Sequence, residues 1–253
     1  MTGRSALVTG GARRIGRAIA LTLAAHGWDV AVHYGQSRDE AEALAAEIRR
    51  HDRRAIALAA DLTRESEVAT LMPRATEAIG PLTLLVNNAS AFERDDVLTV
   101  TRASWDRHLE TNLRAPFVLM QEFARQLPAG AEGSVVNILD ERVWNLTPYF
   151  VSYTVSKAAL WTLTQTMALA LAPRVRVNGI GPGPTLPSPR QSDAQFRQQV
   201  DLLPLRRGTT PDEIARVVMF ILESPAMTGQ MIALDGGQHL NWAPTSRVPP
   251  ASE

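Results

Sequence analysis

SALVTGGARRIG, residues 5–16, sets the architecture expected for the whole chain. It begins with a short apolar run, 6–8, continues through a glycine-containing turn, and leads into a pattern that predicts a helix over 15–26. Gly10 and Gly16 let the backbone bend sharply and approach a pyrophosphate at the N-terminus of that helix. The alternative is a plain glycine turn, but the place directly after the first strand favours a nucleotide site.

The rest of the chain repeats this alternation of a short apolar run and a longer helical pattern. The predicted strands lie at 6–8, 29–33, 55–59, 82–86, 134–139, 175–179 and 231–234. They are continuously apolar, as expected for parallel strands that are buried on both faces. The predicted helices lie at 15–26, 38–51, 65–79, 104–127, 152–171 and 211–222. Repeated strand–helix–strand units predict an α/β fold with a doubly wound, Rossmann-like parallel sheet.

Two segments interrupt the rhythm. Residues 181–207 are rich in proline and carry only a short helical pattern near 192–200. A long connection of this kind in a compact domain is usually a lid or a binding loop. Residues 241–253 form a polar, proline-containing stretch that is typical of a disordered tail. We therefore predict a single domain over 1–240, with a substrate loop at about 181–207 and a tail after it.

Composition excludes several classes of function. The 253 residues carry a formal net charge of zero, so no general attraction to nucleic acid or to a membrane surface is expected. The chain contains no cysteine, and its five histidines lack metal-ligand spacing, so we expect neither disulfides nor a metal site. No apolar run approaches the ~20 residues of a membrane span, and no signal peptide is recognisable. A cytoplasmic protein is expected.

Tyr153 and Lys157 stand four residues apart in a predicted helix and therefore share one face. Lys157 is the only lysine among 26 basic side chains, and arginine is a poor substitute for a compact ammonium. A nearby ammonium favours the phenolate, so it should lower the pKa of Tyr153 and suit that residue to proton transfer near neutral pH. The same spacing also occurs by chance in many helices, so the pair alone decides nothing.

The end of the second predicted strand bears on the choice of nucleotide. An NAD-dependent enzyme places Asp or Glu there to accept a hydrogen bond from the ribose 2′-hydroxyl. This chain reads HYGQSR over 33–38, and its first acid is Asp39. Arg13, Ser37 and Arg38 are candidates to hold a 2′-phosphate by charge-assisted hydrogen bonds, although solvated surface side chains are the alternative. The missing carboxylate favours NADPH.

Further motifs follow the predicted strands in a fixed order: Asp61-Leu62, Asn87-Asn88-Ala89-Ser90, Thr111-Asn112-Leu113, Pro182-Gly183 with Thr185, and Asp235-Gly236-Gly237. Together with Tyr153 and Lys157, they resemble the short-chain dehydrogenase/reductase family over nearly the whole chain. The resemblance implies that Asn112 supports a proton relay and that Lys157 binds the nicotinamide ribose. It implies a cofactor set of Gly10, Arg13, Arg14, Ile15, Gly16, His33, Tyr34, Ser37, Asp61, Leu62, Asn88, Ala89, Ser90, Tyr153, Lys157, Pro182, Gly183 and Thr185.

Departures from the common family pattern narrow the resemblance. Most members have a serine 13 residues before the tyrosine, where this chain has Asp140. Asp140, Arg14 in the glycine loop and Phe92 after the Asn-Asn-Ala motif together resemble pteridine reductases and the related dihydromonapterin reductases. These enzymes reduce pterin rings with NADPH. Gln36 departs from their phosphate-binding segment, which has a basic residue there.

The chemistry implied by this resemblance assigns a role to each residue. Asp140 would relay a proton through Tyr153 to a ring nitrogen, and Asn112 and Lys157 complete the catalytic set. Phe92 would stack on one face of the pterin, while Arg14 and Ser90 contact its edge. Each side chain has a plainer alternative. Asp140 pairs with Arg142 at the surface in that interpretation, Phe92 belongs to the core, and Trp144 either lines the pocket or anchors its loop.

Three functions remain open at this stage. The first is an NADPH-dependent pteridine or dihydropteridine reductase, and the second is an NADPH-dependent reductase of a ketone or a cyclic imine. The third is a protein that binds NADPH without turnover, against which the retention of Asn112, Tyr153 and Lys157 argues. The predicted helices 104–127 and 152–171 are apolar on more than one side, so a homotetramer is expected, with a larger intramolecular core as the alternative.

Overall fold

The computed structural model describes residues 3–188 and 190–240. In these residues, seven parallel strands form one sheet in the order β3-β2-β1-β4-β5-β6-β7. The strands are β1 (Ser5–Val8), β2 (Asp29–Tyr34), β3 (Ala55–Ala59), β4 (Leu84–Asn87), β5 (Gly133–Ile138), β6 (Val175–Pro182) and β7 (Met231–Leu234). The prediction of a doubly wound parallel α/β sheet is confirmed. The predicted tail, 241–253, lies outside the described residues.

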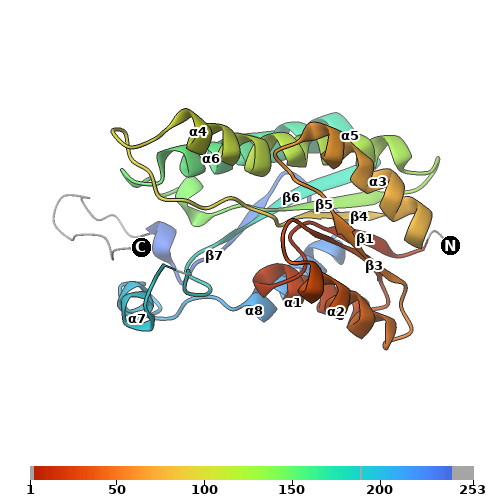
Figure 1. Ribbon diagram of the computed structural model, residues 1–253, viewed down its shortest axis with the longest axis horizontal. Helices are drawn as coiled ribbons and strands as arrows, with labels where there is room; N and C mark the ends of the chain where they lie inside the picture. Colours follow the sequence, from red (N-terminus) through yellow and green to blue (C-terminus); the bar gives the residue numbers. More distant parts are fainter. Residues whose placement is uncertain (1–2, 189, 241–253) are drawn as a thin grey trace.

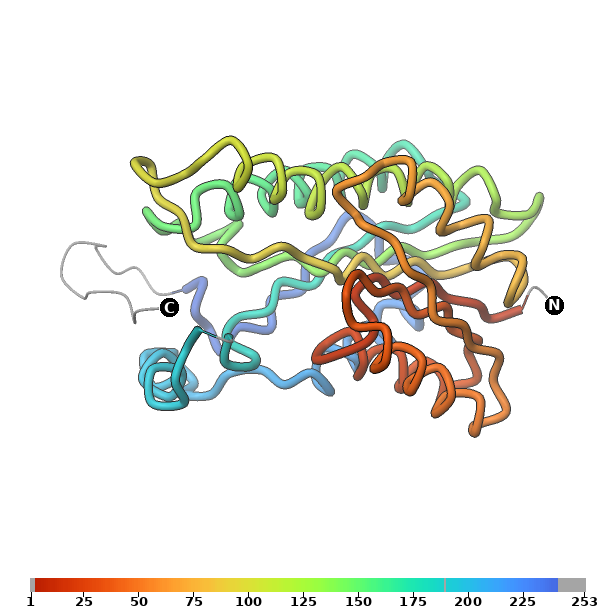
Figure 2. Tube along the Cα trace, in the orientation of Figure 1, coloured from red at the N-terminus to blue at the C-terminus, as the bar shows by residue number. Residues whose placement is uncertain are grey.

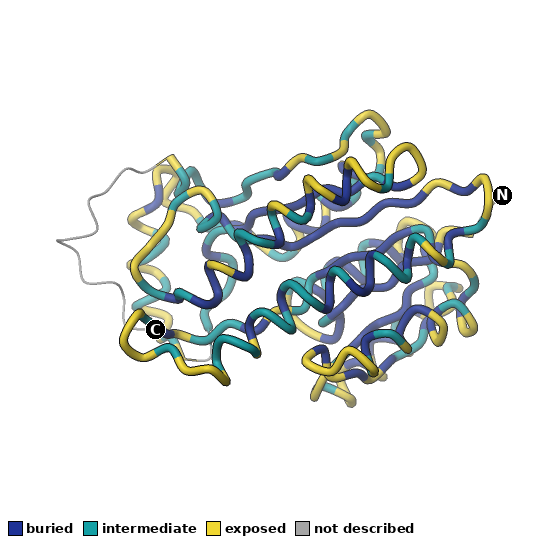
Figure 3. Tube along the Cα trace, turned by 90° about the horizontal axis from the view of Figure 1, so that it is seen from above, coloured by how far each residue is buried: buried dark blue, intermediate teal, exposed yellow. Residues whose placement is uncertain are grey.

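Helices cover both faces of this sheet (Figure 1). One layer contains α1 (Arg14–Ala25), α2 (Arg38–Arg49) and α8 (Pro211–Leu222), packed on the first of two large apolar clusters. The other layer contains α3 (Glu65–Ile79), α4 (Arg102–Leu109), α5 (Ala115–Gln126) and α6 (Val151–Leu171), with α3, α5 and α6 packed on the second cluster. Buried residues follow the strands and the inner helix faces, and exposed residues lie mainly on outer helix faces and in loops (Figure 3).

The strands are buried because each faces a helix layer on both sides. In β4, for example, Leu84 and Val86 point to one apolar cluster and Leu85 points to the other. This alternation in a continuously apolar strand is the arrangement expected of a parallel sheet between two helix layers. None of the helices in the described part of the chain is long and apolar enough to cross a membrane.

The prediction of one continuous helix over 104–127 is wrong. The apolar pattern over 104–127 predicts one helix, but the structure has α4, a π-helical turn η1 (Glu110–Arg114) and then α5. The sequence offers no strong signal for this change because Pro116 lies near the start of α5, where proline is tolerated. Such π-helical turns are frequent at functional sites, and this one carries Asn112.

The order of the strands determines where a ligand can bind. The chain moves from β1 to β2 and β3 on one side, then crosses to β4 on the other side of β1. In open α/β sheets, ligands bind outside the carboxyl ends of the strands at this reversal. The connection after β6, including α7 (Asp193–Asp201), lies beyond this end of the sheet (Figure 2).

Candidate active site

A cleft of about 1190 Å³ lies at the carboxyl ends of the strands around the reversal of strand order. Its walls come from the segments after β1, β2, β3 and β4, and from α4 with the start of η1. Most of the predicted cofactor residues line it, namely Gly10, Arg13, Arg14, Ile15, Gly16, His33, Tyr34, Ser37, Asp61, Leu62, Asn88, Ala89 and Ser90. Arg38, in contrast, lies outside this lining as the first residue of α2.

Gly16 fits the turn after β1 because no other residue has room there. A Cβ at position 16 would lie 2.2 Å from the carbonyl oxygen of Gly10 and 2.6 Å from Nδ2 of Asn88. Asn88 Nδ2 donates to the carbonyls of Thr9 and Gly10 at 2.9 and 3.0 Å, so the loop after β4 fixes the loop after β1. The turn is therefore a cradle whose space depends on glycine, as a pyrophosphate site at a helix N-terminus requires.

His33 holds this turn from the opposite side. Its Nδ1 accepts a hydrogen bond from the Gly10 N–H at 3.0 Å, and its Nε2 lies 3.1 Å from the carbonyl oxygen of Ala60. Burial lowers the pKa of His33 to about 4, so the ring is neutral at physiological pH. His33 thus braces the loop through its ring and offers no positive charge to a phosphate.

The open end of the cleft offers polar groups near the end of β2. Arg13 has a side chain that is 63% exposed, and its guanidinium lies 3.5 Å from Glu40. Tyr34, Gln36 and Ser37 line the cleft beside it. Across the cleft, Asp61 accepts hydrogen bonds from the backbone N–H and the hydroxyl of Thr63, which hold the pKa of its carboxyl below the ordinary value.

Asn112 is fully buried in the π-helical turn η1. Its Oδ1 accepts from the Ala91 N–H at 2.7 Å, and its Nδ2 donates to the Ala91 carbonyl at 2.9 Å and to Ser156 Oγ at 3.0 Å. The side chain therefore joins the loop after β4 to α6. The amide of Asn112 therefore has a positioning role, and its support of a proton relay stays a prediction.

Asp140 and Tyr153 meet in a second, smaller pocket of about 280 Å³. The Tyr153 hydroxyl donates to Asp140 Oδ2 at 2.7 Å, while Oδ1 accepts from the Arg142 N–H at 2.9 Å. Asp140 thus lies in the pocket and contacts the candidate acid, rather than standing alone at the surface. Lys157 lies one turn along α6, with its Nζ donating to the Ile138 carbonyl at 2.7 Å and 5.8 Å from the Tyr153 ring centroid.

The expected pKa of Tyr153 is wrong in direction. Burial, the negative charge of Asp140 and the hydrogen bond to it raise the pKa of Tyr153 well above 10. Burial also lowers the pKa of Lys157 to about 8, with Asp140 acting in the opposite direction. The sequence shows that an ammonium is near, but desolvation and a carboxylate disfavour the phenolate more strongly. Tyr153 accordingly keeps its proton at neutral pH, as a proton donor must.

An aromatic wall closes one side of the smaller pocket. Phe92 stacks on Phe150 with ring centroids 4.8 Å apart and meets Tyr153 edge to face at 4.7 Å. The Arg142 guanidinium lies 4.6 Å from the Phe150 centroid and 5.5 Å from that of Phe92. Phe92 is half-buried and lines the pocket, so it is not a core residue. Trp144 does not line the pocket; it contacts the rings of Trp161 and His239 and anchors its loop.

Comparison with known proteins agrees with this geometry. A family model described as enoyl-(acyl carrier protein) reductase matches residues 10–239. The chain is 33% identical over 242 residues to the 3-oxoacyl-[acyl-carrier-protein] reductase FabG of Staphylococcus epidermidis, covering 94% of this chain and 99% of the relative. It is 32% identical over 250 residues to a short-chain type dehydrogenase/reductase of Picea abies, covering 93% and 92%. The chain belongs to the short-chain dehydrogenase/reductase family.

A solved structure is more similar still. FolM alternative dihydrofolate reductase 1 from Brucella suis, in complex with NADP, superposes with a TM-score of 0.92. It shares 51% sequence identity over 95% of this chain and 96% of that chain. The resemblance to the short-chain dehydrogenase/reductase family is thereby confirmed, and the similarity to a folate-related reductase agrees with the departures seen in the sequence.

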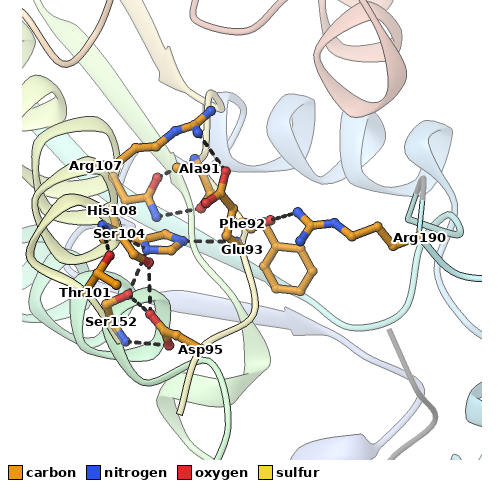
Figure 4. Close-up of polar contacts among 11 residues, drawn as sticks. Ala91, Phe92, Glu93, Asp95, Thr101, Ser104, Arg107, His108, Ser152 and Arg190 are labelled. Atoms are coloured by element: carbon orange, nitrogen blue, oxygen red, sulfur yellow. Dashed lines mark hydrogen bonds and ion pairs between the residues drawn. The ribbon is translucent and has the colours of Figure 1, made fainter. Parts of the chain in front are cut away.

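In this short-chain dehydrogenase/reductase, a buried polar cluster fixes the aromatic wall (Figure 4). Asp95 accepts hydrogen bonds from the N–H and the hydroxyl of Ser152 at the start of α6, and its carbonyl accepts from the Phe150 N–H at 2.7 Å. His108 bridges Ser152 Oγ at 2.7 Å and the Glu93 N–H at 3.1 Å. Ser152 and His108 are fully buried, so the cluster holds the segment after Phe92 against α6 and does not face substrate.

The loop after β6 closes the pocket from the other side. The Arg14 guanidinium donates to the carbonyls of Leu186 and Pro187 at 3.2 and 2.9 Å, and Arg190 donates to the Phe92 carbonyl at 3.3 Å (Figure 4). The predicted residues Pro182, Gly183 and Thr185 line the pocket where β6 ends. The prediction of a binding loop is thus consistent with its position, and Arg14 serves to hold that loop as well as to line both cavities.

Sequence reasoning missed several residues of this pocket. Glu141 and Gln238 line it, although neither belongs to a recognised motif, and Arg142 entered only as a surface partner of Asp140. Phe150 does not line the pocket but stacks on Phe92, which does. Phe150 has a left-handed backbone, with φ 59° and ψ 45°, which its place directly before a helix does not reveal. The one available signal was position, since Glu141 and Arg142 directly follow Asp140 at the end of a strand that leads into the site.

Proposed function

We propose that this protein is an NADPH-dependent reductase that acts on a pterin or dihydropterin ring. The observation that carries the proposal is the hydrogen bond from the Tyr153 hydroxyl to Asp140 Oδ2, at 2.7 Å, inside a pocket walled by Phe92. A ketone reductase needs one donor for one carbonyl oxygen, whereas a ring nitrogen needs a proton. A carboxyl group beside the candidate acid provides a second group that can carry that proton.

NADPH is the cofactor, in agreement with the NADP held by the similar reductase of Brucella suis. The turn at Gly10 and Gly16 leaves the close approach that a pyrophosphate needs, and the segment after β2 carries no acid until Asp39. Arg13, Ser37 and Tyr34 are the side chains we assign to the 2′-phosphate end of the cleft. When bound, NADPH supplies the hydride.

The chain's own residues supply the proton and position the ring. Tyr153 donates its phenolic proton to the nitrogen adjacent to the reduced carbon. Asp140, which accepts from the Tyr153 hydroxyl through Oδ2, then takes a proton from solvent and passes it to the Tyr153 phenolate. Lys157, whose Nζ is held by the Ile138 carbonyl, offsets the negative charge that Tyr153 gains in this step. Phe92, fixed by Phe150 behind it, supports one face of the flat ring.

The size of the pocket favours a small flat substrate over a long acyl chain. Its volume is about 280 Å³, and Arg14 and Arg190 tie the loop after β6 to its two sides. The similarity to the Brucella suis reductase, at 51% identity, also exceeds that to the 3-oxoacyl reductase of Staphylococcus epidermidis, at 33%. The second candidate, a reductase of a ketone or a cyclic imine, rests on that more distant similarity.

We also propose that the protein is a homotetramer. Val155 and Leu169 lie two turns to either side of Thr162 on one exposed face of α6, with exposed fractions of 41% and 84% for the two apolar residues. An exposed apolar helix face is best explained by burial against another copy of the chain. Light scattering at micromolar concentration should give four times the mass of the chain, and a monomeric mass would reject the assembly.

The function is tested by NADPH oxidation with dihydrobiopterin, dihydromonapterin, dihydrofolate, biopterin and simple ketones. We expect turnover of at least one dihydropterin and little turnover of the ketones. Asp140→Asn keeps the cap on the Arg142 N–H but cannot carry a proton, so it should lower turnover about 10²-fold or more and remove one limb of the pH–rate profile. Asp140→Ser should impair pterin reduction while activity on ketones is kept or rises.

Two outcomes would overturn this assignment. If ketones are the better substrates and both variants at Asp140 turn over normally, the protein is the generic ketone or imine reductase. If NADPH binds but no substrate of the panel is reduced, while Tyr153→Phe leaves every measured property unchanged, the protein binds NADPH without catalysis.

A further inference from the structure

Two residues that line the smaller pocket, Glu141 and Gln238, each have a buried acceptor atom that the catalytic groups do not use. Glu141 is only 4% exposed, and its Oε2 has no hydrogen-bond partner among the residues described by the structure. Gln238 Oε1 is likewise buried without a partner in that part of the chain. Both residues line the pocket, next to Asp140 and Arg142. A buried acceptor without a partner is costly, so a pair of them in one pocket indicates a ligand that brings donors.

The two residues come from segments that pack together at this end of the sheet. Glu141 begins the 3₁₀ turn η2 (Glu141–Val143), directly after Asp140, and Gln238 begins the turn η3 (Gln238–Leu240) after β7. The turns contact one another, and Asn145 Nδ2 donates to the Gln238 carbonyl at 3.2 Å. The backbone at both acceptors is therefore fixed, and their side chains form one wall of a preformed site.

The surroundings of Glu141 raise the pKa of its carboxyl group. Burial first, and then the charges of Asp140 and Asp235, raise the pKa of Glu141 to about 8, while Arg142 acts in the opposite direction. Asp235 is already occupied by the backbone N–H groups of Gly237 and His239 and by the His239 ring. The charge of Glu141 also contributes to the raised pKa of Tyr153, which keeps its proton at neutral pH. Among these acidic neighbours in the described part of the chain, Glu141 is the one with a buried carboxylate oxygen that has no hydrogen-bond partner.

We infer that Glu141, with Gln238, is the specificity-determining group of this pocket and recognises an amidine-type edge, a ring N–H beside an exocyclic amino group. A carboxylate accepts two parallel N–H bonds from such an edge, as it does from a guanidinium. The inference rests on the proposed function, because the amino-substituted edge of a pterin has this pattern. A simple ketone has no donor to offer, so it would leave both acceptors unsatisfied.

The test compares two rings that differ at this edge. Pterin carries the 2-amino group beside a ring N–H, whereas lumazine carries a carbonyl in place of the amino group. Their dissociation constants are measured by calorimetry on the full chain saturated with NADP⁺. Wild-type protein should bind pterin at least about tenfold more tightly than lumazine, because hydrogen bonds to a charged acceptor contribute about that much.

Glu141→Gln keeps the size of the side chain and replaces one acceptor by a donor. It should weaken pterin binding about 10- to 100-fold and bring the two ligands within about twofold of each other. Gln238→Leu should weaken pterin binding by less. Glu132→Gln is the matched control, because Glu132 is exposed and directly precedes β5, at the opposite end of the sheet. It should bind both ligands as the wild type does, and all variants should retain wild-type NADPH affinity if they fold.

A second measurement follows the proton that Glu141 should release when pterin binds. Wild-type protein should release protons when it binds pterin at pH 7, measured as a dependence of the binding enthalpy on the ionisation enthalpy of the buffer. Glu141→Gln should release fewer. A wild type that binds both rings equally, a Glu141→Gln variant that weakens both equally, or a failure of pterin to bind would overturn the inference.

Turnover separates this inference from the proposed function. If wild-type protein selects pterin over lumazine but reduces no dihydropterin with NADPH, the proposed function fails and the recognition by Glu141 stands. If dihydropterin is reduced while the two rings bind alike, the recognition by Glu141 fails alone.

Discussion

The cofactor cleft and the smaller pocket share Arg14, Ile15, Asn88 and Ser90, yet they are built in different ways. The cleft depends on backbone: Gly16 leaves space that a Cβ would fill, and Asn88 and His33 are committed to holding the turn. The pocket depends on side chains from distant segments, and two of their buried acceptor atoms have no hydrogen-bond partner among the described residues. We therefore expect the cleft to accept a nucleotide that is common to many enzymes, and the pocket to select its ligand through its unsatisfied groups.

The largest effect on turnover should come from replacing Tyr153, the proposed proton donor in the pocket. Tyr153→Phe removes the proton and keeps the ring edge against Phe92, so turnover should fall about 10²–10⁴-fold. NADPH affinity should change by no more than about twofold because the cleft is untouched. Steady-state rates and cofactor titration measure both. Tyr149→Phe, which keeps the ring beneath Arg94, is the control, and equal loss in both variants would contradict the assignment.

A backbone change should damage the cleft instead. Gly16→Ala forces a Cβ to within 2.2 Å of the Gly10 carbonyl oxygen, and overpacking of this kind costs about 1–3 kcal/mol or more. We expect NADPH affinity to fall by about 10- to 100-fold, with a lower melting temperature. Gly35→Ala is the matched control in the same cleft, since nothing lies within 4 Å of a Cβ there. Equal affinities for these two variants would show that the steric cradle is unimportant.

A smaller effect is expected at the open end of the cleft. Arg13→Gln removes an exposed guanidinium that we assign to the 2′-phosphate of NADPH, a group that NADH lacks. NADPH binding should therefore weaken about tenfold, while NADH binding is unchanged. The ratio of the two dissociation constants, measured by fluorescence titration, reports it. Arg17→Gln is the control one turn along α1, where the guanidinium is bound to Glu47 at 2.7 Å. A wild type that prefers NADH would instead remove the role assigned to Arg13.

The smallest effect concerns how the buried carboxyl of Glu141 changes the folding stability of the protein with pH. Its folded pKa of about 8 lies above the value of 4.5 expected for an exposed glutamate. The folded state therefore keeps a proton that the unfolded chain releases, and the stability from this group is present below about pH 4.5 and lost as the pH rises to about 8. Relative to wild type, Glu141→Gln should gain melting temperature between pH 5 and pH 9, by roughly 2–4 °C for each kcal/mol.

The melting curves are compared at fixed ionic strength, with Glu132→Gln as the control. Since Glu132 is exposed, that variant should differ from wild type by the same amount at every pH. A difference for Glu141→Gln that does not grow with pH would show that the carboxyl is not held protonated in the fold, and it would weaken the contrast between the complete cleft and the unsatisfied pocket.

The sequence predicted the fold and the cofactor end well because both depend on local patterns. β3, α3, α8 and β7 begin and end at the predicted residues, and the other strands and helices differ by a few residues. The exception is the predicted helix 104–127, which is divided by the π-helical turn at Asn112. That turn forms where the Asn112 amide reaches both Ala91 and Ser156, and such contacts have no period in the sequence.

The sequence by itself determined the sheet, its helix layers, the glycine turn and the pairing of Tyr153 with Lys157 on one helix face. Each of these follows from spacing within a few residues, such as the period of an apolar run or one turn of helix. Tertiary structure alone decided the raised pKa of Tyr153, the stack of Phe92 on Phe150 and the meeting of Glu141 with Gln238. These depend on burial and on contacts between segments up to about a hundred residues apart, where desolvation and charge act through space rather than along the chain.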